Sequence, residues 1–234
     1  MKQSWVKESV IIALSIVGLA FCIKGGIQSY VDKGRIVSVK GLSEVEVPAN
    51  KVVWPIVFKE VGNNLPVLYN SINSTSTKII AYLKGNGITE AEISVNAPEV
   101  IDMQAERYSS NDKPYRYNVT SVITVTSEQV EVVRKLIASQ GELLKDGVAI
   151  VGGDYENRII YEYTLLNDLK PQMIAEATRN ARKAAEQFAK DSDSKLGKIV
   201  WASQGQFSIT DRDNNTPYIK KVRVVTSVNY SLKN

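Results

Sequence analysis

The chain has 234 residues, a formal net charge of +4, 44% hydrophobic side chains and no histidine. Without histidine, Ser-His-Asp and Cys-His catalysis and histidine-ligated zinc are excluded. The single cysteine, Cys22, excludes an intrachain disulfide, a CxxC redox pair and a thiolate metal cluster. We therefore predict no catalytic residues, no metal ligands and no cofactor-binding residues.

The first predicted element is an apolar segment at residues 10–23, which contains no charged side chain. Lys2 and Lys7 precede it and Lys24 follows it. This pattern is typical of an export signal or a signal anchor. We predict a membrane segment with a short linker over residues 1–30, ahead of a folded domain over residues 34–234. The segment therefore predicts a folded domain that is delivered to a membrane or through it.

Three other interpretations of this segment stay open. Its length fits the apolar core of a cleaved signal and is below the roughly 20 residues of a spanning helix, although no A-x-A cleavage pattern follows. The sequence Leu19-Ala20-Phe21-Cys22 has the outline of a lipobox, but Phe21 stands where a small residue is usual. A short apolar run also fits a buried helix.

Alternating side chains predict a strand over residues 35–47, with Glu44 and Glu46 on its solvated face. A turn at residues 48–50 leads to a second strand over residues 52–61, where Pro55 indicates a sheet edge or a bulge. We predict that these two strands form a hairpin.

A three-to-four-residue spacing predicts a helix from Leu65 to Leu83, ended by Gly85 or Gly87. Strands are then predicted over residues 88–103 and 115–126, joined by a polar tip at residues 104–114. Thr126 and Gln129 fit a capping box for a short helix that carries Val130, Val133, Leu136 and Ile137 and ends by Gly141.

The remaining elements complete the domain. A central strand is predicted over residues 148–165, and Asp168 is the predicted N-cap of the longest helix. One side of that helix carries Ile174, Ala177, Ala181, Ala184, Ala185 and Phe188. Strands over residues 199–210 and 218–232, joined by a polar tip at residues 211–217, are predicted to form a second hairpin. The charges of Lys220, Lys221 and Arg223 are assigned to the solvated side of the last strand, so no nucleic-acid partner is predicted.

The element order ββα ββα βα ββ predicts an α+β fold. We expect hairpin-built antiparallel sheets with helices packed on one face and two similar ββα-type halves, preceded by the N-terminal membrane segment.

Several short motifs resemble the SIMPL-domain family in order and spacing. The stretches that carry the resemblance are Val37-Ser38-Val39-Lys40-Gly41, Val45-Glu46-Val47-Pro48-Ala49, Tyr82-Leu83-Lys84 with Gly87-Ile88 and Ile93-Ser94-Val95, Tyr115 to Val125, Ala177 to Ala184, and Leu196-Gly197-Lys198-Ile199. Lys40 and the pair Ala49-Asn50 depart from the family pattern. The resemblance covers residues 35–232.

This resemblance implies a bacterial cell-envelope protein that is anchored in the cytoplasmic membrane with its domain in the periplasm, or that is cleaved and exported. Some members of the family assemble into large homo-oligomers, and members have been linked to oxidative-stress defence. It supplies no catalytic position. We therefore predict a non-enzymatic protein that acts by self-association as a homo-oligomer or by binding an envelope protein partner.

Two alternatives remain. A small-molecule site would use Tyr155, Tyr161 and Tyr163, although tyrosine is also an ordinary strand residue. A histidine-independent enzyme would use Glu44 and Glu46 as a carboxylate pair about 7 Å apart along the strand. Two solvated glutamates and core tyrosines are the simpler interpretations.

Overall fold

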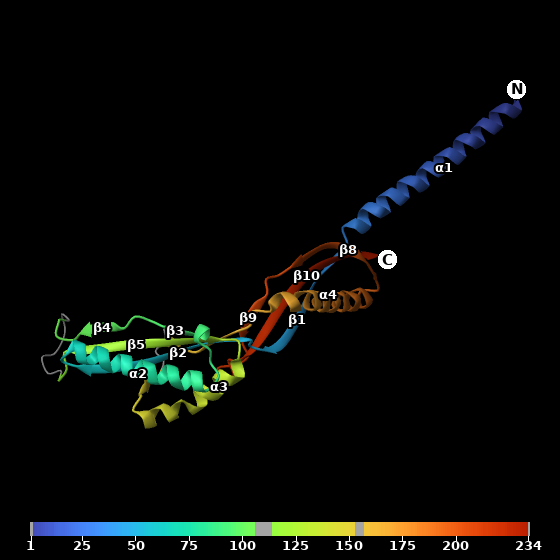
Figure 1. Cartoon of the computed structure of the whole chain (residues 1–234). Coiled ribbons are helices and arrows are strands. Elements are labelled where there is room, and N and C mark those ends of the chain that lie inside the picture. The colour runs from blue at the N-terminus through green and yellow to red at the C-terminus, as the bar shows by residue number, and fades with distance from the viewer. Residues whose placement is uncertain (1, 106–113, 153–156, 234) are drawn as a thin grey trace. The chain divides into compact units, whose positions relative to one another are not determined.

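The computed structural model describes residues 2–105, 114–152 and 157–233. Tyr155 and residues 106–113 of the predicted polar tip lie outside this description. The fold is α+β, as predicted, and the chain forms two compact units (Figure 1). Unit 1 comprises residues 1–45, 167–209 and 222–234, and unit 2 comprises residues 46–166 and 210–221. The two units therefore alternate along the chain and are not consecutive halves.

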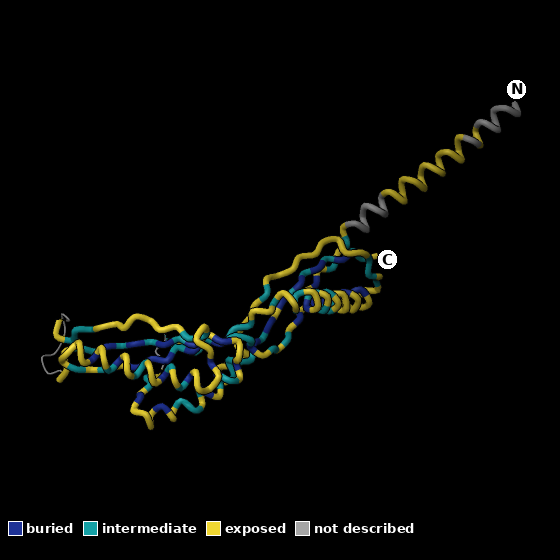
Figure 2. Tube along the Cα trace, in the orientation of Figure 1, coloured by how far each residue is buried: buried dark blue, intermediate teal, exposed yellow. Residues whose placement is uncertain are grey.

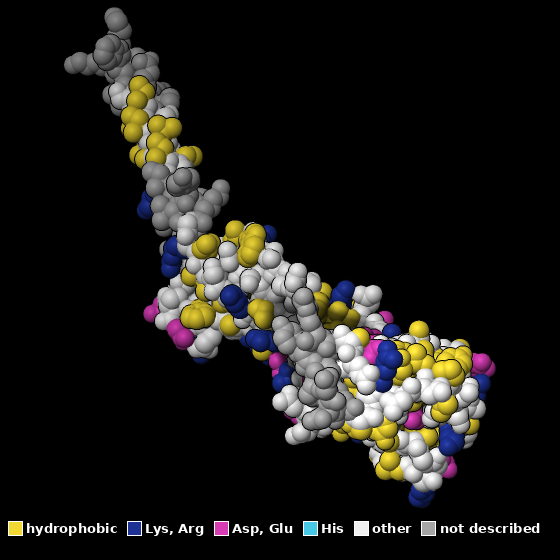
Figure 3. All heavy atoms as spheres, turned by 90° about the vertical axis from the view of Figure 1, so that its left-hand side faces the viewer, with side chains coloured by type: hydrophobic (Ala, Val, Ile, Leu, Met, Phe, Trp, Pro, Cys, Tyr) yellow, Lys and Arg dark blue, Asp and Glu magenta, His cyan; other side chains and the backbone are white. Residues whose placement is uncertain are grey.

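The N-terminal helix α1 (Lys2–Lys33) contains the predicted apolar segment. Its described hydrophobic side chains are exposed, from Val10 at 52% to Phe21 at 72% (Figure 3). A search of the described residues finds no helix that combines the length and the hydropathy needed to cross a membrane.

Unit 1 holds a four-stranded sheet and helix α4 in addition to α1. These further elements are β1 (Ile36–Pro48), α4 (Leu166–Asp191), β8 (Lys195–Gln204), β9 (Ser208–Asp211) and β10 (Ile219–Lys233), of which all but β8 extend beyond the unit by one or more residues. The strand order is β1-β10-β8, and β9 also pairs with β10. Strand β8 is antiparallel to β10, which confirms the predicted second hairpin.

Helix α4 packs through a stripe of small residues four apart. Ala177, Ala181 and Ala185 are fully buried, because their methyl groups let the helix backbone approach the sheet closely. A Cβ atom built on Gly41 of β1 would lie 1.8 Å from the carbonyl oxygen of Ala177. Phe188, predicted on the buried side, is instead 59% exposed, since it lies off this stripe.

Unit 2 is built on a six-stranded sheet with two helices. Its elements are β2 (Lys51–Gly62), α2 (Leu65–Gly85), η1 (Glu90–Glu92), β3 (Ile93–Val95), β4 (Glu99–Asp102), β5 (Tyr117–Ser127), α3 (Val130–Ser139), η2 (Gln140–Asp146), β6 (Ile150–Val151) and β7 (Ile160–Glu162). The strand order is β3-β5-β2-β6, with β4 added to β5 and β7 added to β2. Helices α2 and α3 pack on this sheet (Figure 1).

Helix α2 shows why its sequence folds as predicted. The Asn64 side chain accepts a hydrogen bond from the Val67 amide, and Gly87 takes the left-handed conformation at φ +93° just after the helix. Ile72, Ile79 and Leu83 are at most 1% exposed in the core of unit 2. Burial of each such side chain contributes about 1.5–3 kcal/mol.

Several predicted pairings are wrong. Strands β1 and β2 do not form a hairpin, because β1 pairs with β10 while β2 pairs with β5. The strand expected over residues 88–103 is divided into η1, β3 and β4, since the chain leaves β5 between Val95 and Glu99.

In the central strand expected over residues 148–165, the described residues form two short strands, β6 and β7, at one side of β2, and residues 153–156 lie outside the description. Pro55 lies between their pairing positions and has no N–H group to donate, which explains an interruption there. Among the described residues, Pro55 is thus paired only with β5, which runs along residues 52–62 of β2, and this position is a local edge as predicted.

Two predicted caps are also different. The N-cap of α3 is Gln129, whose side chain forms no capping hydrogen bond. The backbone amide of Gln129 donates to the Ser127 hydroxyl. The predicted capping box between Thr126 and Gln129 is therefore wrong. Helix α4 begins at Leu166, which places Asp168 in its first turn.

Lys220 is not on the solvated side of β10. It is 7% exposed and shares the buried face of the strand with Val222 and Val224, because Asp211 forms an ion pair with its ammonium group.

Candidate functional site

Apart from α1, unit 1 exposes a run of apolar residues on its edge strand β8. All three residues of the run Ile199-Val200-Trp201 are exposed, at 50%, 61% and 52% (Figure 2). Strand β8 pairs with β10 on one side and ends the sheet order on the other. Its other edge therefore presents backbone N–H and C=O groups to pairing by another strand.

The run exposes apolar side chains on both faces of the sheet. Ile199 pairs with Tyr230, whose side chain lies in the core, while Trp201 pairs with Asn229, which points to the other face. Register shifts on both sides of Tyr230 show that β8 bulges at Val200 and near Lys198. From Trp201 to Gln204 the register is regular, so this part is the straight, accessible edge.

The core behind β8 is small. Its cluster of buried residues contains Val39, Ala181, Ala185, Val228 and Tyr230. Two of these five are alanines, which bury little apolar area. The single cysteine of the chain, Cys22, is exposed in α1 and forms no disulfide. Unit 1 also buries Met173, Ala177, Ala189, Val222 and Val224, so its core is rich in small side chains.

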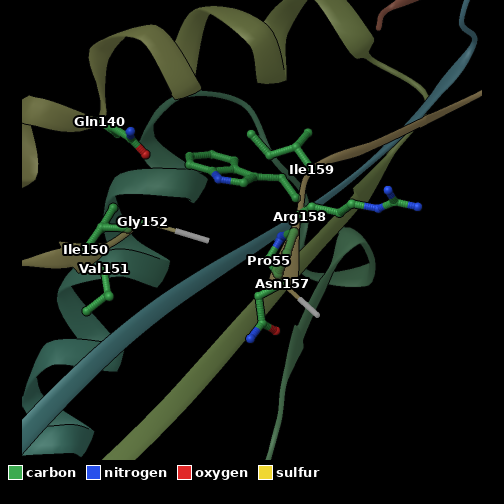
Figure 4. Close-up of a pocket in the computed structure, with 9 residues that line it drawn as sticks. Pro55, Gln140, Ile150, Val151, Gly152, Asn157, Arg158 and Ile159 are labelled. Carbon is green, nitrogen blue, oxygen red and sulfur yellow. The ribbon is translucent and has the colours of Figure 1, made fainter. Parts of the chain in front are cut away.

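Unit 2 contains a hollow of about 400 Å³ beside Pro55, at the interruption between β6 and β7 (Figure 4). Its described lining is Trp54, Pro55, Gln140, Ile150, Val151, Gly152, Asn157, Arg158 and Ile159. In Figure 4 the Arg158 side chain points away from Gln140 and Val151. The lining described by the structure includes no carboxylate, so these residues supply no acid and base pair.

Of the tyrosines considered for a small-molecule site, Tyr161 lies in the protein core. Tyr161 is 9% exposed and belongs to the core of unit 2, as the core interpretation expected. Its ring meets that of Tyr218 edge to face at 6.2 Å, and the Arg134 guanidinium lies 3.4 Å from the centre of the Tyr218 ring. Burial raises the pKa of the Tyr161 hydroxyl. This stack holds the segment 210–221 against unit 2 and leaves Tyr161 little surface for a ligand.

The two glutamates of the enzyme alternative are both exposed on β1. Glu46 lies 3.6 Å from the Arg212 guanidinium, while Glu44 belongs to unit 1. Exposed carboxylates are the expected solvated arrangement. Among the described residues, no group of three or more acidic, cysteine or histidine side chains is placed to hold a metal ion.

The polar tip between β9 and β10 is organised by Asp213. Its carboxylate accepts from the hydroxyl and the amide of Thr216, from the amide of Asn215 and from the Arg212 guanidinium. These bonds, the Thr216 hydroxyl first, lower the pKa of Asp213 from 3.8 to about 2. The arrangement is a local turn and not a binding site.

This turn gives a pH prediction. Because the folded pKa of Asp213 is lowered, its stabilising bonds are fully formed above about pH 4 and are lost as the pH falls toward 2. A carbon-13 titration of the Asp213 carboxyl group should therefore show a midpoint near 2. An unshifted midpoint, at the ordinary value of 3.8, would contradict the turn.

A comparison with protein-family models assigns the chain to a family. The family model SIMPL, described as a protein of unknown function (DUF541), matches residues 37–229. The chain belongs to the SIMPL family. The match spans both units and omits α1, and a search of curated proteins finds no match.

The SIMPL motifs that carried the resemblance are packing residues in the structure. Gly41 lies directly against Ala177 and Ala181, and a Cβ on Gly197 would lie 2.2 Å from the Ser231 hydroxyl. These contacts explain why glycine and alanine stand at those positions, and they leave the chemistry of the SIMPL domain unassigned.

The exposed run on β8 was missed in the sequence, although a signal was present. A strand alternates its side chains between two faces, so three consecutive apolar residues place at least one on each face. Ile199-Val200-Trp201 in an edge strand is such a case.

Proposed function

We propose that this SIMPL protein is a non-enzymatic, membrane-anchored component of the cell envelope that assembles with further copies of itself through β8. The observation that carries the proposal is the accessible edge at Trp201–Gln204, next to the exposed side chains of Ile199 and Val200. A strand from a second copy would satisfy the free backbone groups and cover these side chains.

The small size of unit 1 favours such an assembly. Without residues 1–33, unit 1 has 68 residues, and domains below about 70–80 residues rarely gain enough stability from one core and add disulfides, a metal or oligomerisation. The single cysteine excludes an intrachain disulfide. Covering Trp201 and its neighbours in a second copy would add apolar burial that the isolated unit lacks.

Membrane attachment is supported by the exposed apolar side chains of α1, among them Leu14, Ile16 and Phe21. Transfer of these side chains into lipid would remove them from water. Attachment to one membrane would also raise the local concentration of copies and favour pairing at β8. A periplasmic location of the domain, an additional envelope protein partner and a role in stress defence are proposed on the family resemblance alone.

The test is the mass of the full chain in detergent micelles, measured by light scattering at several protein concentrations. We expect an oligomer whose mass is independent of concentration. Replacing both Val200 and Trp201 with lysine should give a monomer with an unchanged circular dichroism spectrum, because lysine on a strand edge opposes pairing.

Val67→Lys is the matched control, since Val67 is 63% exposed on α2 of unit 2. This variant should keep the mass of the unmodified chain. A monomeric unmodified chain, or an oligomer that survives both β8 lysines, would refute assembly through this strand.

A second candidate function, small-molecule binding, is favoured by an apolar hollow of about 310 Å³ in unit 2. It is lined by Leu65, Tyr69, Ile72, Pro98, Val100 and Val119. Its volume is at the lower end of ligand pockets, and its apolar lining suits a small hydrophobic molecule.

A further inference from the structure

Three chain segments meet at Arg35, shortly after the end of α1. Helix α1 ends at Lys33 and β1 begins at Ile36, so Arg35 lies two residues beyond the helix. The carbonyl oxygen of Arg35 accepts from the amide of Leu232 at 2.8 Å, and its guanidinium donates to the Ser194 hydroxyl at 2.9 Å. The beginning of β8 and the end of β10 are therefore held at the base of α1.

Two lysines face each other at this base. Lys195 pairs directly with Lys233 across the antiparallel strands, and both side chains are exposed. Within the described ranges, neither lysine forms an ion pair. Like charges directly opposite each other on two strands are destabilising. Within the described residues, no ion pair therefore offsets the repulsion between the two lysines.

The surroundings of this pair are cationic as well. Arg35 is bonded to this end through Ser194, and Lys190 and Lys198 lie within five residues of Lys195 along the chain, as do the carboxylates of Asp191 and Asp193. We name these five residues, Arg35, Lys190, Lys195, Lys198 and Lys233, the basic end of unit 1.

We propose that the basic end binds the phosphate headgroups of anionic phospholipids, an inference that rests on the proposed membrane insertion of α1. The apolar segment ends at Ile23, residues 24–33 of α1 add about 15 Å of helix, and the two residues after Lys33 span at most about 7 Å. An inserted α1 would therefore hold Arg35 and its bonded neighbours within about 22 Å of the apolar core of the membrane, and closer when the helix tilts. Anionic lipids attract cationic segments placed within a Debye length of the surface.

A lipid headgroup suits the site better than an acidic protein because of this tether. A phosphate between Lys195 and Lys233 accepts hydrogen bonds from both ammonium groups and offsets their mutual repulsion. Ile36, 47% exposed at the start of β1, supplies an apolar side chain beside these cations, as expected at a lipid interface.

The experiment uses the full chain in lipid nanodiscs, made either of phosphatidylcholine alone or of phosphatidylcholine and phosphatidylglycerol in equal parts. A membrane-impermeant acylating reagent labels the lysines, and mass spectrometry reports the rate at each one. Labelling of Lys195 and Lys233 should be about fivefold slower in the anionic discs, and high salt should remove this protection. Lys145, exposed in unit 2, should be labelled equally in both discs.

A charge variant provides the second measurement. Lys195→Gln with Lys233→Gln should abolish the lipid-dependent protection of the neighbouring Lys198, whereas Lys145→Gln should leave it unchanged. Glutamine is neutral and both positions are exposed, so the double variant should fold at least as stably in neutral detergent.

The outcomes separate the two proposals. Equal labelling in both discs, with α1 still resistant to carbonate extraction, would overturn headgroup binding and leave membrane insertion intact. Release of the chain by carbonate would overturn both insertion and headgroup binding. Protection of Lys195 in detergent without lipid would assign the basic end to a protein contact and overturn the lipid proposal.

Discussion

Replacing Gly41 with alanine is expected to destabilise unit 1 by about 3 kcal/mol or more, the upper end of the cost of overpacking a core. The new Cβ atom would lie 1.8 Å from the carbonyl oxygen of Ala177 and 2.5 Å from the amide nitrogen of Ala181. Both are backbone atoms, so no side-chain rotation removes the clash. Helix α4 would have to move away from β1 and lose its close packing.

The measurement is the thermal unfolding of the full chain in detergent. A loss of this size lowers the midpoint by about 6–12 °C in a chain of this length. Gly141→Ala is the control, because a Cβ at Gly141 in unit 2 meets no atom within 4 Å. Equal midpoints for the two variants would show that Gly41 does not lie against α4.

The same contact shows how much of the fold the sequence predicts. Alternation along residues 35–47 and 218–232 placed β1 and β10, and alanines four apart predicted a helix able to approach a sheet closely. These signals are local, because each depends on the period of one element. The pairing of the strands could not be predicted in the same way, because β1 pairs with β10, whose residues lie nearly 200 positions away in the chain.

The errors around Pro55 have a similar cause. The β-rich composition of residues 148–165 predicts one strand, yet the described residues of this segment pair with β2 through β6 and β7, with a gap opposite Pro55. The missing donor of Pro55 belongs to the neighbouring strand and is invisible in the sequence of residues 148–165 itself. The hollow beside Pro55 therefore could not be predicted from either segment alone.

Lys220 shows that an ion-pair partner elsewhere in the chain can allow a charged side chain to be buried. In the sequence it alternates with apolar residues and resembles Lys221 and Arg223. In the structure it shares a face with the valines, because the turn organised by Asp213 brings Asp211 of β9 to its ammonium group. The carboxylate stands nine positions earlier and comes within reach only when this turn forms.

This pairing predicts that Asp211→Asn is more harmful than Lys220→Met. Removing the carboxylate leaves the Lys220 ammonium, 9% exposed as a side chain, without its anion, and an uncompensated buried charge costs several kcal/mol. Since Asp211 itself is half exposed, we expect a loss of about 2–3 kcal/mol. Methionine replaces the lysine with an apolar chain of similar length, so the loss in Lys220→Met should stay below about 1 kcal/mol.

The free energy of unfolding of both variants, measured with urea, decides the question, and the double variant completes a thermodynamic cycle. If the ion pair determines the burial of Lys220, the double variant should recover most of the stability lost in Asp211→Asn. Lys221→Met is the control on the opposite face of β10. If Asp211→Asn and Lys221→Met have the same small effect, the Lys220 ammonium reaches water without Asp211, and the burial of this lysine then reflects its alkyl chain alone.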